Sequence, residues 1–313
     1  MKPSSPNLQT IPNDSAPSAR AHLAAVLQAL FVAFLWSTSW VLIKIGLQAS
    51  LPPLTFAGLR YALAFVCLAP LVIASPAHRV ALKAFTRSTW AWLALLGVVY
   101  YAITMAAQYI GLAYLPSATV TVLLNFTPVL IALAAGWLNS ERPTRLQWGG
   151  ILLSGFGALI YFYPLQIPAG QGVGLAVVLV GLAANAASAV LGRKINHQSG
   201  LSPLLVTFTS MGIGGGLLLG GGALTQGFGP LDLTQWLIIA WLAVVNTALA
   251  FTLWNHTLRT LTAVESSIIN GTMLPQIAIL AWIFLGEPLN TRQIGGILLV
   301  ATGTLIVQLR RRA

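Results

Sequence analysis

The amino-acid sequence predicts an all-α integral membrane protein, with ten transmembrane helices arranged as two inverted five-helix repeats. Of its 313 residues only 7% are charged and 57% are hydrophobic, and the mean hydropathy is +0.83. Soluble domains carry about 25% charged residues, so this chain has too few to cover a surface in water. Apolar runs of roughly 20 residues recur along it, each long enough to cross about 30 Å of hydrocarbon. A repeated apolar phrase supplies the third observation.

A hydropathy window of about 19 residues places the helices over 22–48, 53–74, 90–113, 116–138, 145–164, 171–193, 201–224, 234–257, 262–284 and 290–309. Short connections containing Pro or Gly join most of them, so neighbouring helices are expected to be antiparallel. Residues 1–20 are rich in Pro, Ser and Asn and lack apolar periodicity, which predicts a disordered cytoplasmic tail. The first repeat is then assigned to 21–164 and the second to 165–313.

The basic residues set the predicted orientation. With the N-terminus inside, thirteen Lys and Arg residues fall in inner segments and three, Lys44, Arg60 and Arg292, on the outer side. Positive charge concentrates in cytoplasmic loops, so both termini are predicted to be cytoplasmic. This distribution also accounts for the net charge of +11 without a nucleic-acid partner.

The phrase QWGGILLSGFGALI, starting at Gln147, recurs 146 residues later as QIGGILLVATGTLI, starting at Gln293. Over 141–160 against 287–306, ten of twenty aligned residues are identical. Weaker matches reach back through the third and eighth helices at the same offset, and through the first two helices of each half at an offset near 150. The shared Gly-Gly pair is best explained by close packing of the fifth and tenth helices.

Five helices per repeat is an odd number, so the two halves are predicted to cross the membrane in opposite directions. Inverted repeats recur in secondary transporters, where one half moves against the other around a site near the middle of the membrane. A duplicated membrane protein without a transport role is the plainer alternative.

The segments LWSTSWVLIKIGL, LPPLTFAGLRYALA and the paired PSATVTVLLNFTPVLIALAAGWLNSERP and TAVESSIINGTMLPQIAILAWIFLGEPL resemble the EamA family of the drug/metabolite transporter superfamily. The resemblance covers roughly 22–309. Its Gly-Glu signature is complete at Gly286-Glu287 but reads Asn139-Ser140-Glu141 in the first copy. It implies export of metabolites or amino acids through the inner membrane.

Polar residues inside a membrane are costly and usually face the bundle interior. A cavity with aromatic walls, amides and hydroxyls suits a small zwitterionic or aromatic solute, because aromatic faces offer contact area and attract ammonium groups. The predicted substrate-binding residues are Trp36, Trp40, Tyr101, Gln108, Asn125, Asn185, Trp254 and Asn270. For each isolated amide, a role in holding helices together is an equally good interpretation.

Four further residues are predicted to serve gating or coupling: Arg60, Pro128, Glu265 and Pro275. The two prolines lie mid-helix, where they are expected to interrupt the fourth and ninth helices and free backbone carbonyls. Arg60 needs an interior partner or a wet cavity, and Glu287 is the better candidate for pairing with Arg60 or Lys44. Lys44 is itself expected to extend toward the outer interface.

Other function classes have weaker support. The scattered acidic residues and histidines form no metal-binding or nucleophilic motif, so an enzyme is not predicted and no cofactor or metal is expected. A channel or a lipid transporter is a further alternative, without a filter motif in its favour. The expected partners are a small-molecule substrate and the lipid bilayer, with the chain as a monomer or weak dimer.

Overall fold

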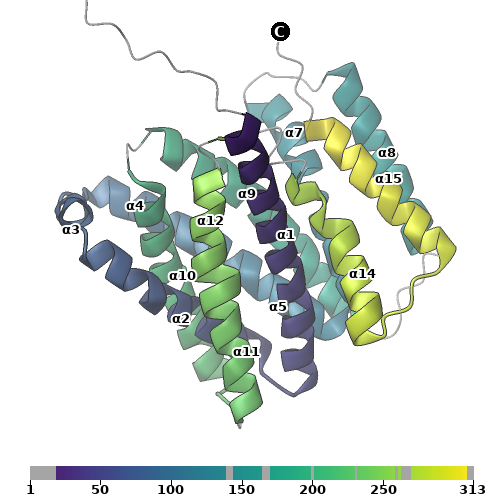
Figure 1. Cartoon of the computed structure of the whole chain (residues 1–313). Helices are drawn as coiled ribbons and strands as arrows, with labels where there is room; N and C mark the ends of the chain where they lie inside the picture. Colours follow the sequence, from purple (N-terminus) through teal and green to yellow (C-terminus); the bar gives the residue numbers. More distant parts are fainter. Residues whose placement is uncertain are drawn as a thin grey trace, which may run out of the picture.

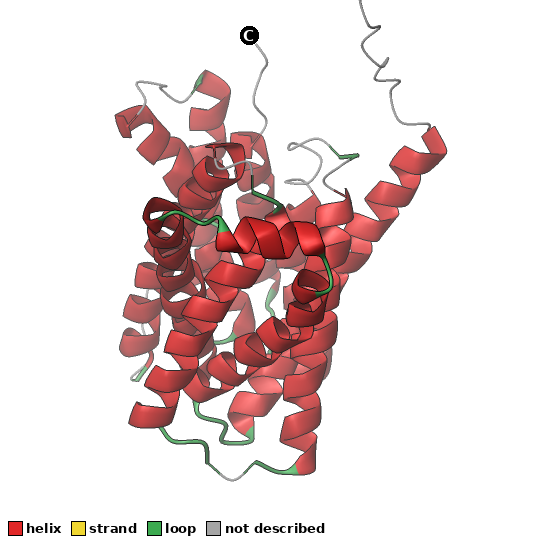
Figure 2. Cartoon of the chain, turned by 90° about the vertical axis from the view of Figure 1, so that its left-hand side faces the viewer, coloured by secondary structure: helices red, strands yellow, loops and turns green. Residues whose placement is uncertain are grey.

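The computed structural model describes residues 19–138, 144–163, 170–198, 201–229, 231–257, 260–261 and 269–308. Throughout these ranges the regular secondary structure is helical, as predicted (Figure 2). The described part of the first helix begins at Ala19 and includes the last two residues assigned to the predicted tail. The rest of that tail lies outside the described residues.

The helices of the first predicted repeat are α1 (Ala19–Gln48), α2 (Pro53–Ile73), α4 (Arg87–Leu96), η1 (Gly97–Thr104), α5 (Met105–Tyr114), α6 (Ser117–Leu124), α7 (Thr127–Leu138) and α8 (Arg145–Phe162). Those of the second are α9 (Gln171–Gln198), α10 (Pro203–Thr225), α11 (Leu233–Ala243), η2 (Val244–Leu249), α12 (Ala250–Thr257), α14 (Met273–Leu285) and α15 (Thr291–Gln308). A short additional helix, α3 (Pro76–Lys83), lies across the spanning helices (Figure 2).

Six helical stretches of the described chain are long and apolar enough to cross a membrane: 19–48, 53–73, 87–114, 171–192, 203–225 and 233–254. Shorter apolar helices lie in three of the other predicted spans, at Ser117–Ile131, Ile269–Leu285 and Thr291–Val307. Large apolar side chains such as Leu152, Phe156 and Leu237 remain more than half exposed on the outside of the bundle. A surface of this kind is stable against lipid, and the chain is a multi-pass membrane protein.

The helix starts follow from local sequence. Thr144 and Gln147 form a capping box at the start of α8, and Asp232 and Gln235 form another at the start of α11. In each box the first side chain accepts a hydrogen bond from a free backbone N–H of the first turn, and the Gln side chain binds back to the cap residue. Thr86 caps α4 in the simpler way.

Prolines divide the fourth and ninth predicted helices, as expected. The α6 helix ends at Leu124, four residues before Pro128, and α7 begins at Thr127. A proline ring clashes with the carbonyl of the residue four positions earlier and cannot donate to it. In the second repeat a turn at Thr272 precedes α14, three residues before Pro275. The Thr127 and Thr272 hydroxyls each donate to a carbonyl three residues back, which satisfies an acceptor at each interruption.

Two π-helical segments, η1 and η2, were not predicted. Each lies in the middle of an otherwise continuous helix, and the two overlap when the repeats are aligned at 146 residues. In both, a threonine hydroxyl donates to the carbonyl five residues earlier, from Thr104 to Val99 and from Thr247 to Leu242. Such bulges are frequently found at functional sites.

The Gly-Gly prediction is confirmed at the crossing of α8 and α15. A Cβ added to Gly150 would lie 2.6 Å from the Gly303 carbonyl oxygen, and one added to Gly296 would lie 2.8 Å from that of Gly157. The contacts run in opposite order along the two helices, which are therefore antiparallel (Figure 1). The α2 and α10 helices, also repeat equivalents, cross in the same sense, with Gly58 against Leu219 and Gly222 against Thr55.

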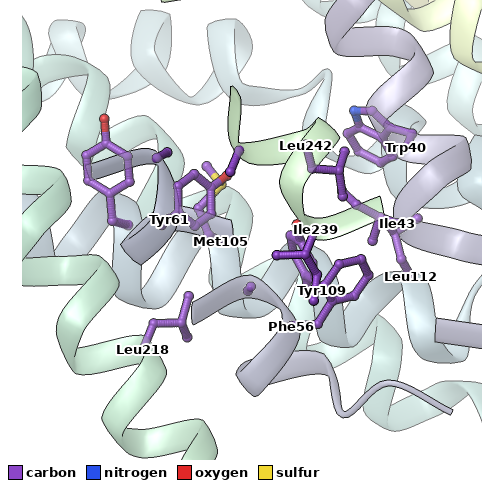
Figure 3. Packing of buried hydrophobic residues seen from close by; sticks show 14 of the residues in the cluster. Trp40, Ile43, Phe56, Tyr61, Met105, Tyr109, Leu112, Leu218, Ile239 and Leu242 are labelled. Carbon is purple, nitrogen blue, oxygen red and sulfur yellow. The ribbon is translucent and has the colours of Figure 1, made fainter. Parts of the chain in front are cut away.

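The largest cluster of buried apolar side chains gathers in one half of the bundle, and smaller clusters lie elsewhere. We call the end where α1 begins the entry end, and the end where α1 finishes the far end (Figure 1). Side chains of the core meet from α1, α2, α5 and α11 toward the far end, among them Trp40, Ile43, Phe56, Tyr109 and Leu242 (Figure 3). Helix packing in this half is close and largely apolar, and the cavity described next lies in the other half.

Candidate functional site: a cavity in the entry half

A cavity of about 670 Å³ lies among helices of both predicted repeats. Its position follows from its walls, which include the first half of α10, the second half of α9, and α12. The lining side chains and backbone come from Leu96, Tyr100, Tyr101, Leu124, Asn125, Thr127, Pro128, Ile131, Asn185, Ser188, Ala189, Gly192, Val206, Thr207, Ser210, Phe251, Trp254, Asn270 and Gly271. A volume of this size accommodates a small organic solute.

Six predicted site residues line this cavity. They are spread over five of the predicted spans and are Tyr101, Asn125, Pro128, Asn185, Trp254 and Asn270. Because the sequence separation between the first and last is more than half of the chain, only the tertiary structure brings them together. Their function in binding or gating stays a prediction.

Aromatic rings form one wall. The Trp36 ring centroid lies 5.1 Å from that of Trp254 and 5.4 Å from that of Phe251. Trp254 and Phe251 line the cavity, whereas Trp36 packs behind them from α1. Tilted aromatic pairs at such distances favour a fixed ring orientation, so Trp36 holds the wall in place without lining it.

Amide groups at the opposite wall are fixed by hydrogen bonds. The Asn185 side chain donates from Nδ2 to Thr127 Oγ1 over 3.0 Å. The Thr304 hydroxyl of α15 lies 3.1 Å from Asn125 Oδ1, to which it can donate. These two asparagines thus connect α9 with α7, and the interruption of the fourth helix with α15. Each amide also retains hydrogen-bonding capacity.

The lining includes no charged side chain among the described residues. Its polar groups are phenols, amides and hydroxyls, and the rest is aliphatic or aromatic. A site of this type can bind a neutral or zwitterionic solute through several hydrogen bonds and ring contacts.

Part of the cavity was missed by the sequence analysis. The wall from α10 contributes Val206, Thr207 and Ser210, none of which was a predicted site residue. The spacing of Thr207 and Ser210, three residues apart on one helical face, was the available signal.

Other predicted residues lie away from the cavity lining. Trp40 is buried in the far-half core, and Gln108 and Pro275 are half-buried on α5 and α14. Glu265 lies outside the described residues. Among the described residues, Trp40, Gln108 and Pro275 do not line this cavity.

The suggested pairing of Glu287 with Arg60 or Lys44 is wrong as a direct contact. Arg60 is 5% exposed and donates from Nε to Thr247 Oγ1 over 3.0 Å and from Nη1 to the Tyr109 hydroxyl over 3.3 Å. Glu287 instead accepts hydrogen bonds from the backbone N–H and the hydroxyl of Ser117. A carboxylate at a helix start satisfies free N–H groups and suits the positive end of the helix dipole.

Lys44 also differs from expectation. Its ammonium group donates over 2.7 Å to the carbonyls of both Leu112 and Leu115, at the C-terminal end of α5. Lys44 therefore caps a helix and does not extend freely to the interface. Together Lys44 and Glu287 hold the two sides of the short connection between α5 and α6.

Comparison with known proteins decides the family. A model described as the EamA-like transporter family matches residues 23–163 and 172–309. The chain belongs to the EamA-like transporter family. The resemblance seen in the sequence is thereby confirmed, and each matched range covers one of the two predicted repeats.

Relatives of this EamA-like chain are transporters. Uncharacterized transporter YvbV of Bacillus subtilis (strain 168) is 27% identical over 293 residues, covering 90% of this chain and 91% of the relative. An S-adenosylmethionine/S-adenosylhomocysteine transporter of Chlamydia trachomatis serovar L2 is 28% identical, over 82% of this chain and 80% of the relative. The probable amino-acid metabolite efflux pump of Salmonella typhimurium is 26% identical, over 89% and 92%.

A solved structure shares the fold of this EamA-like protein. A crystal structure of another protein superposes with a TM-score of 0.64 at 16% sequence identity, covering 91% of this chain and 97% of that chain. At this identity the likeness concerns the arrangement of helices alone.

Proposed function

We propose that this EamA-like protein is a secondary transporter that exports small metabolites, amino acids or related solutes, across the bacterial inner membrane by alternating access. The observation that carries the proposal is the uncharged, aromatic-walled cavity built jointly by helices of both predicted repeats. A site at the interface between two repeats is where secondary transporters bind substrate.

The crossings of equivalent helices support an inverted arrangement. The α8 and α15 helices cross antiparallel through Gly150, Gly157, Gly296 and Gly303, which are repeat equivalents in pairs. Helices related by a two-fold axis in the membrane plane run in opposite directions, so an antiparallel crossing of α8 and α15 is expected. The α2 and α10 helices follow the same pattern.

The location of the cavity supports a state that faces the cytoplasm. Its walls lie mainly in the entry half, while the largest cluster of aromatic and aliphatic side chains closes the far half. With the predicted orientation, in which the termini are cytoplasmic, this is an inward-facing conformation. A solute would enter from the cytoplasm and contact the amides of Asn125 and Asn185 and the Trp254 ring.

A counterflow experiment tests the proposal. Purified full-length protein is reconstituted into liposomes loaded with a mixture of amino acids and S-adenosylmethionine, and uptake of each labelled solute at trace concentration is measured. Saturable uptake above that of protein-free liposomes supports a carrier for this class. Non-saturating flux would favour a channel, and absence of uptake for every amino acid and for S-adenosylmethionine would reject the proposed substrate class.

Coupling to protons is a separate proposal that rests on Glu265, predicted from sequence to lie at membrane depth. A proton-driven carrier normally needs a titratable group in its pathway. If Glu265 is that group, Glu265→Gln keeps exchange in counterflow but loses dependence on an imposed pH gradient. If transport by Glu265→Gln still depends on the pH gradient, another group provides the proton coupling.

A further inference from the structure

A cluster of buried polar side chains lies between α1, α2 and η2, outside the cavity. We call Thr38, Arg60, Asn246 and Thr247 the buried polar cluster. Asn246 Nδ2 donates to the Leu35 carbonyl and to Thr38 Oγ1, the latter over 3.2 Å. Arg60 Nε donates to Thr247 Oγ1 over 3.0 Å. Asn246 and Thr247 have no exposed surface, and Thr38 is half-buried.

Two features of this cluster are unfavourable in the structure as it stands. The Asn246 Oδ1 atom is buried without a hydrogen-bond partner. The Arg60 guanidinium is buried without a carboxylate partner among the described residues, since Asp232 and Glu287 both cap helices. A buried acceptor without a donor and a buried charge without a counter-charge each cost free energy. Groups of this kind are expected where a ligand binds in another state.

The repeat alignment relates this cluster to the cavity. The first two helices of each half align at an offset of 150 residues, and the third helices at 146. Under these registers every member of the cluster has an equivalent that lines the cavity: Ser188 for Thr38, Ser210 for Arg60, Tyr100 for Asn246 and Tyr101 for Thr247.

The contacts agree with this correspondence. The cavity residues come from α9, α10 and η1, where Gly97 of η1 packs against the Ser210 backbone of α10. The cluster comes from the equivalent helices α1, α2 and η2, which pack in the same way and are joined by the bonds from Arg60 and Asn246. The same three-helix arrangement is thus present twice, open around the cavity and closed around the cluster.

We propose that the buried polar cluster is the substrate-binding surface of a second cavity, which faces the far end, and that Arg60 binds the anionic group of the solute there. This inference rests on the alternating access proposed above. In an inverted-repeat carrier the two halves exchange conformations, so surfaces equivalent to the present cavity walls become exposed in the other state. Gln108, the equivalent of the cavity residue Trp254 at 146 residues, belongs to the same surface.

The two surfaces differ in chemistry. Serine and two tyrosines in the present cavity are replaced by arginine, asparagine and threonine in the cluster. The guanidinium group recognises a carboxylate through paired hydrogen bonds. The unpaired Asn246 Oδ1 can accept from an ammonium group. An amino acid or another carboxylate-bearing solute meets both requirements.

Thiol accessibility tests the second cavity without knowledge of the substrate. Cys67 is the single cysteine, so a Cys67→Ser background can carry Thr38→Cys, its equivalent Ser188→Cys, or the control Ser154→Cys, which is fully buried on α8. In proteoliposomes of defined orientation, membrane-impermeant methanethiosulfonates should reach Thr38→Cys only from the far end and Ser188→Cys only from the entry end. Ser154→Cys should react from neither side.

Counterflow on the same proteoliposomes separates the two proposals. If Thr38→Cys is unreactive from the far end in protein that performs counterflow, the second cavity is rejected while the carrier function stands. If both cysteines react from their expected sides but no counterflow occurs, the second cavity stands and the carrier function is lost. Failure of both measurements rejects both.

Charge selectivity tests the assignment of Arg60. At each cysteine the reaction rate of the negatively charged sulfonatoethyl reagent is divided by that of the positively charged trimethylammonium reagent. This rate ratio should be about fivefold higher at Thr38→Cys than at Ser188→Cys, because a nearby cation concentrates anions. Arg60→Gln should abolish this preference, and Arg60→Lys should retain it. Equal preferences at the two cysteines, or a preference that persists in a folded Arg60→Gln protein, would overturn the assignment.

Discussion

The Gly303 carbonyl oxygen lies 2.6 Å from the position that a Cβ on Gly150 would occupy, at the crossing of α8 and α15. Backbone atoms cannot move aside as a flexible side chain can. Gly150→Ala is therefore expected to destabilise the fold by about 1–3 kcal/mol through overpacking. The loss should appear as a lower midpoint of thermal unfolding of the purified protein in detergent.

Gly149→Ala supplies the matched control. No atom lies within 4 Å of a Cβ at Gly149, so alanine there is expected to leave stability unchanged or to raise it by up to about 1 kcal/mol through helix propensity. An unfolding midpoint for Gly150→Ala equal to that of Gly149→Ala would contradict the close crossing.

Glu287 and Ser117 give a second prediction. The carboxylate accepts from the Ser117 backbone N–H over 2.7 Å and from its hydroxyl over 3.1 Å. Glu287→Gln removes the charge at the start of α6 and should cost about 1–2 kcal/mol of stability. Ser117→Ala, which keeps the backbone bond, should cost less. The ranking is measured by thermal unfolding, and a larger loss in Ser117→Ala would show that the hydroxyl, not the carboxylate cap, dominates.

Trp254 provides a prediction for transport. Its ring lines the cavity and packs against Trp36 at 5.1 Å. Trp254→Ala removes about 1–3 kcal/mol of aromatic contact, which corresponds to roughly a 5- to 150-fold increase in the counterflow KM. Trp282→Ala is the control, because Trp282 is 59% exposed on the outside of α14. If Trp254→Ala leaves the KM unchanged, the aromatic wall is not part of the binding site.

Replacement of Pro128 is expected to lower transport without lowering stability. Pro128→Ala restores an N–H and removes the ring that ends α6 at Leu124. The interruption at Asn125 and Phe126 can then close into helix, with unchanged or higher stability, and Asn125 is displaced from the cavity. Counterflow is expected to fall about tenfold, as for a loss of ~1.4 kcal/mol in binding.

The control is Pro70→Ala, since Pro70 lies exposed in the last turns of α2. It should leave counterflow intact. Equal activity of Pro128→Ala and the unsubstituted protein would show that transport does not depend on the interruption.

Several elements could be predicted because their causes are local in the sequence. Length and hydropathy are properties of single segments, so the six long apolar helices were recognisable. The interruptions at Pro128 and Pro275 follow from the missing N–H and the ring of one residue. The close approach of α8 and α15 follows from small residues repeated in register.

Hydrogen-bond partners could not be predicted in the same way. Arg60 binds Thr247, which is 187 residues away, and Glu287 binds Ser117, which is 170 residues away. The side-chain charges suggested that acidic residues pair with basic ones. In the structure, backbone groups at helix ends bind both Lys44 and Glu287 instead. The sequence does not indicate which hydroxyl or carbonyl group will become the hydrogen-bond partner of a given side chain.

The sequence by itself determined the membrane class, the family and the internal duplication, because composition, motif and repeat are all read along one chain. Only the tertiary structure decided which polar residues share a cavity and which are buried around Arg60. The physical reason is that a helix carries polar groups on several faces, and packing between distant helices alone selects the face that remains open. The repeat then relates the open surface to the closed one, which neither the sequence nor the packing does separately.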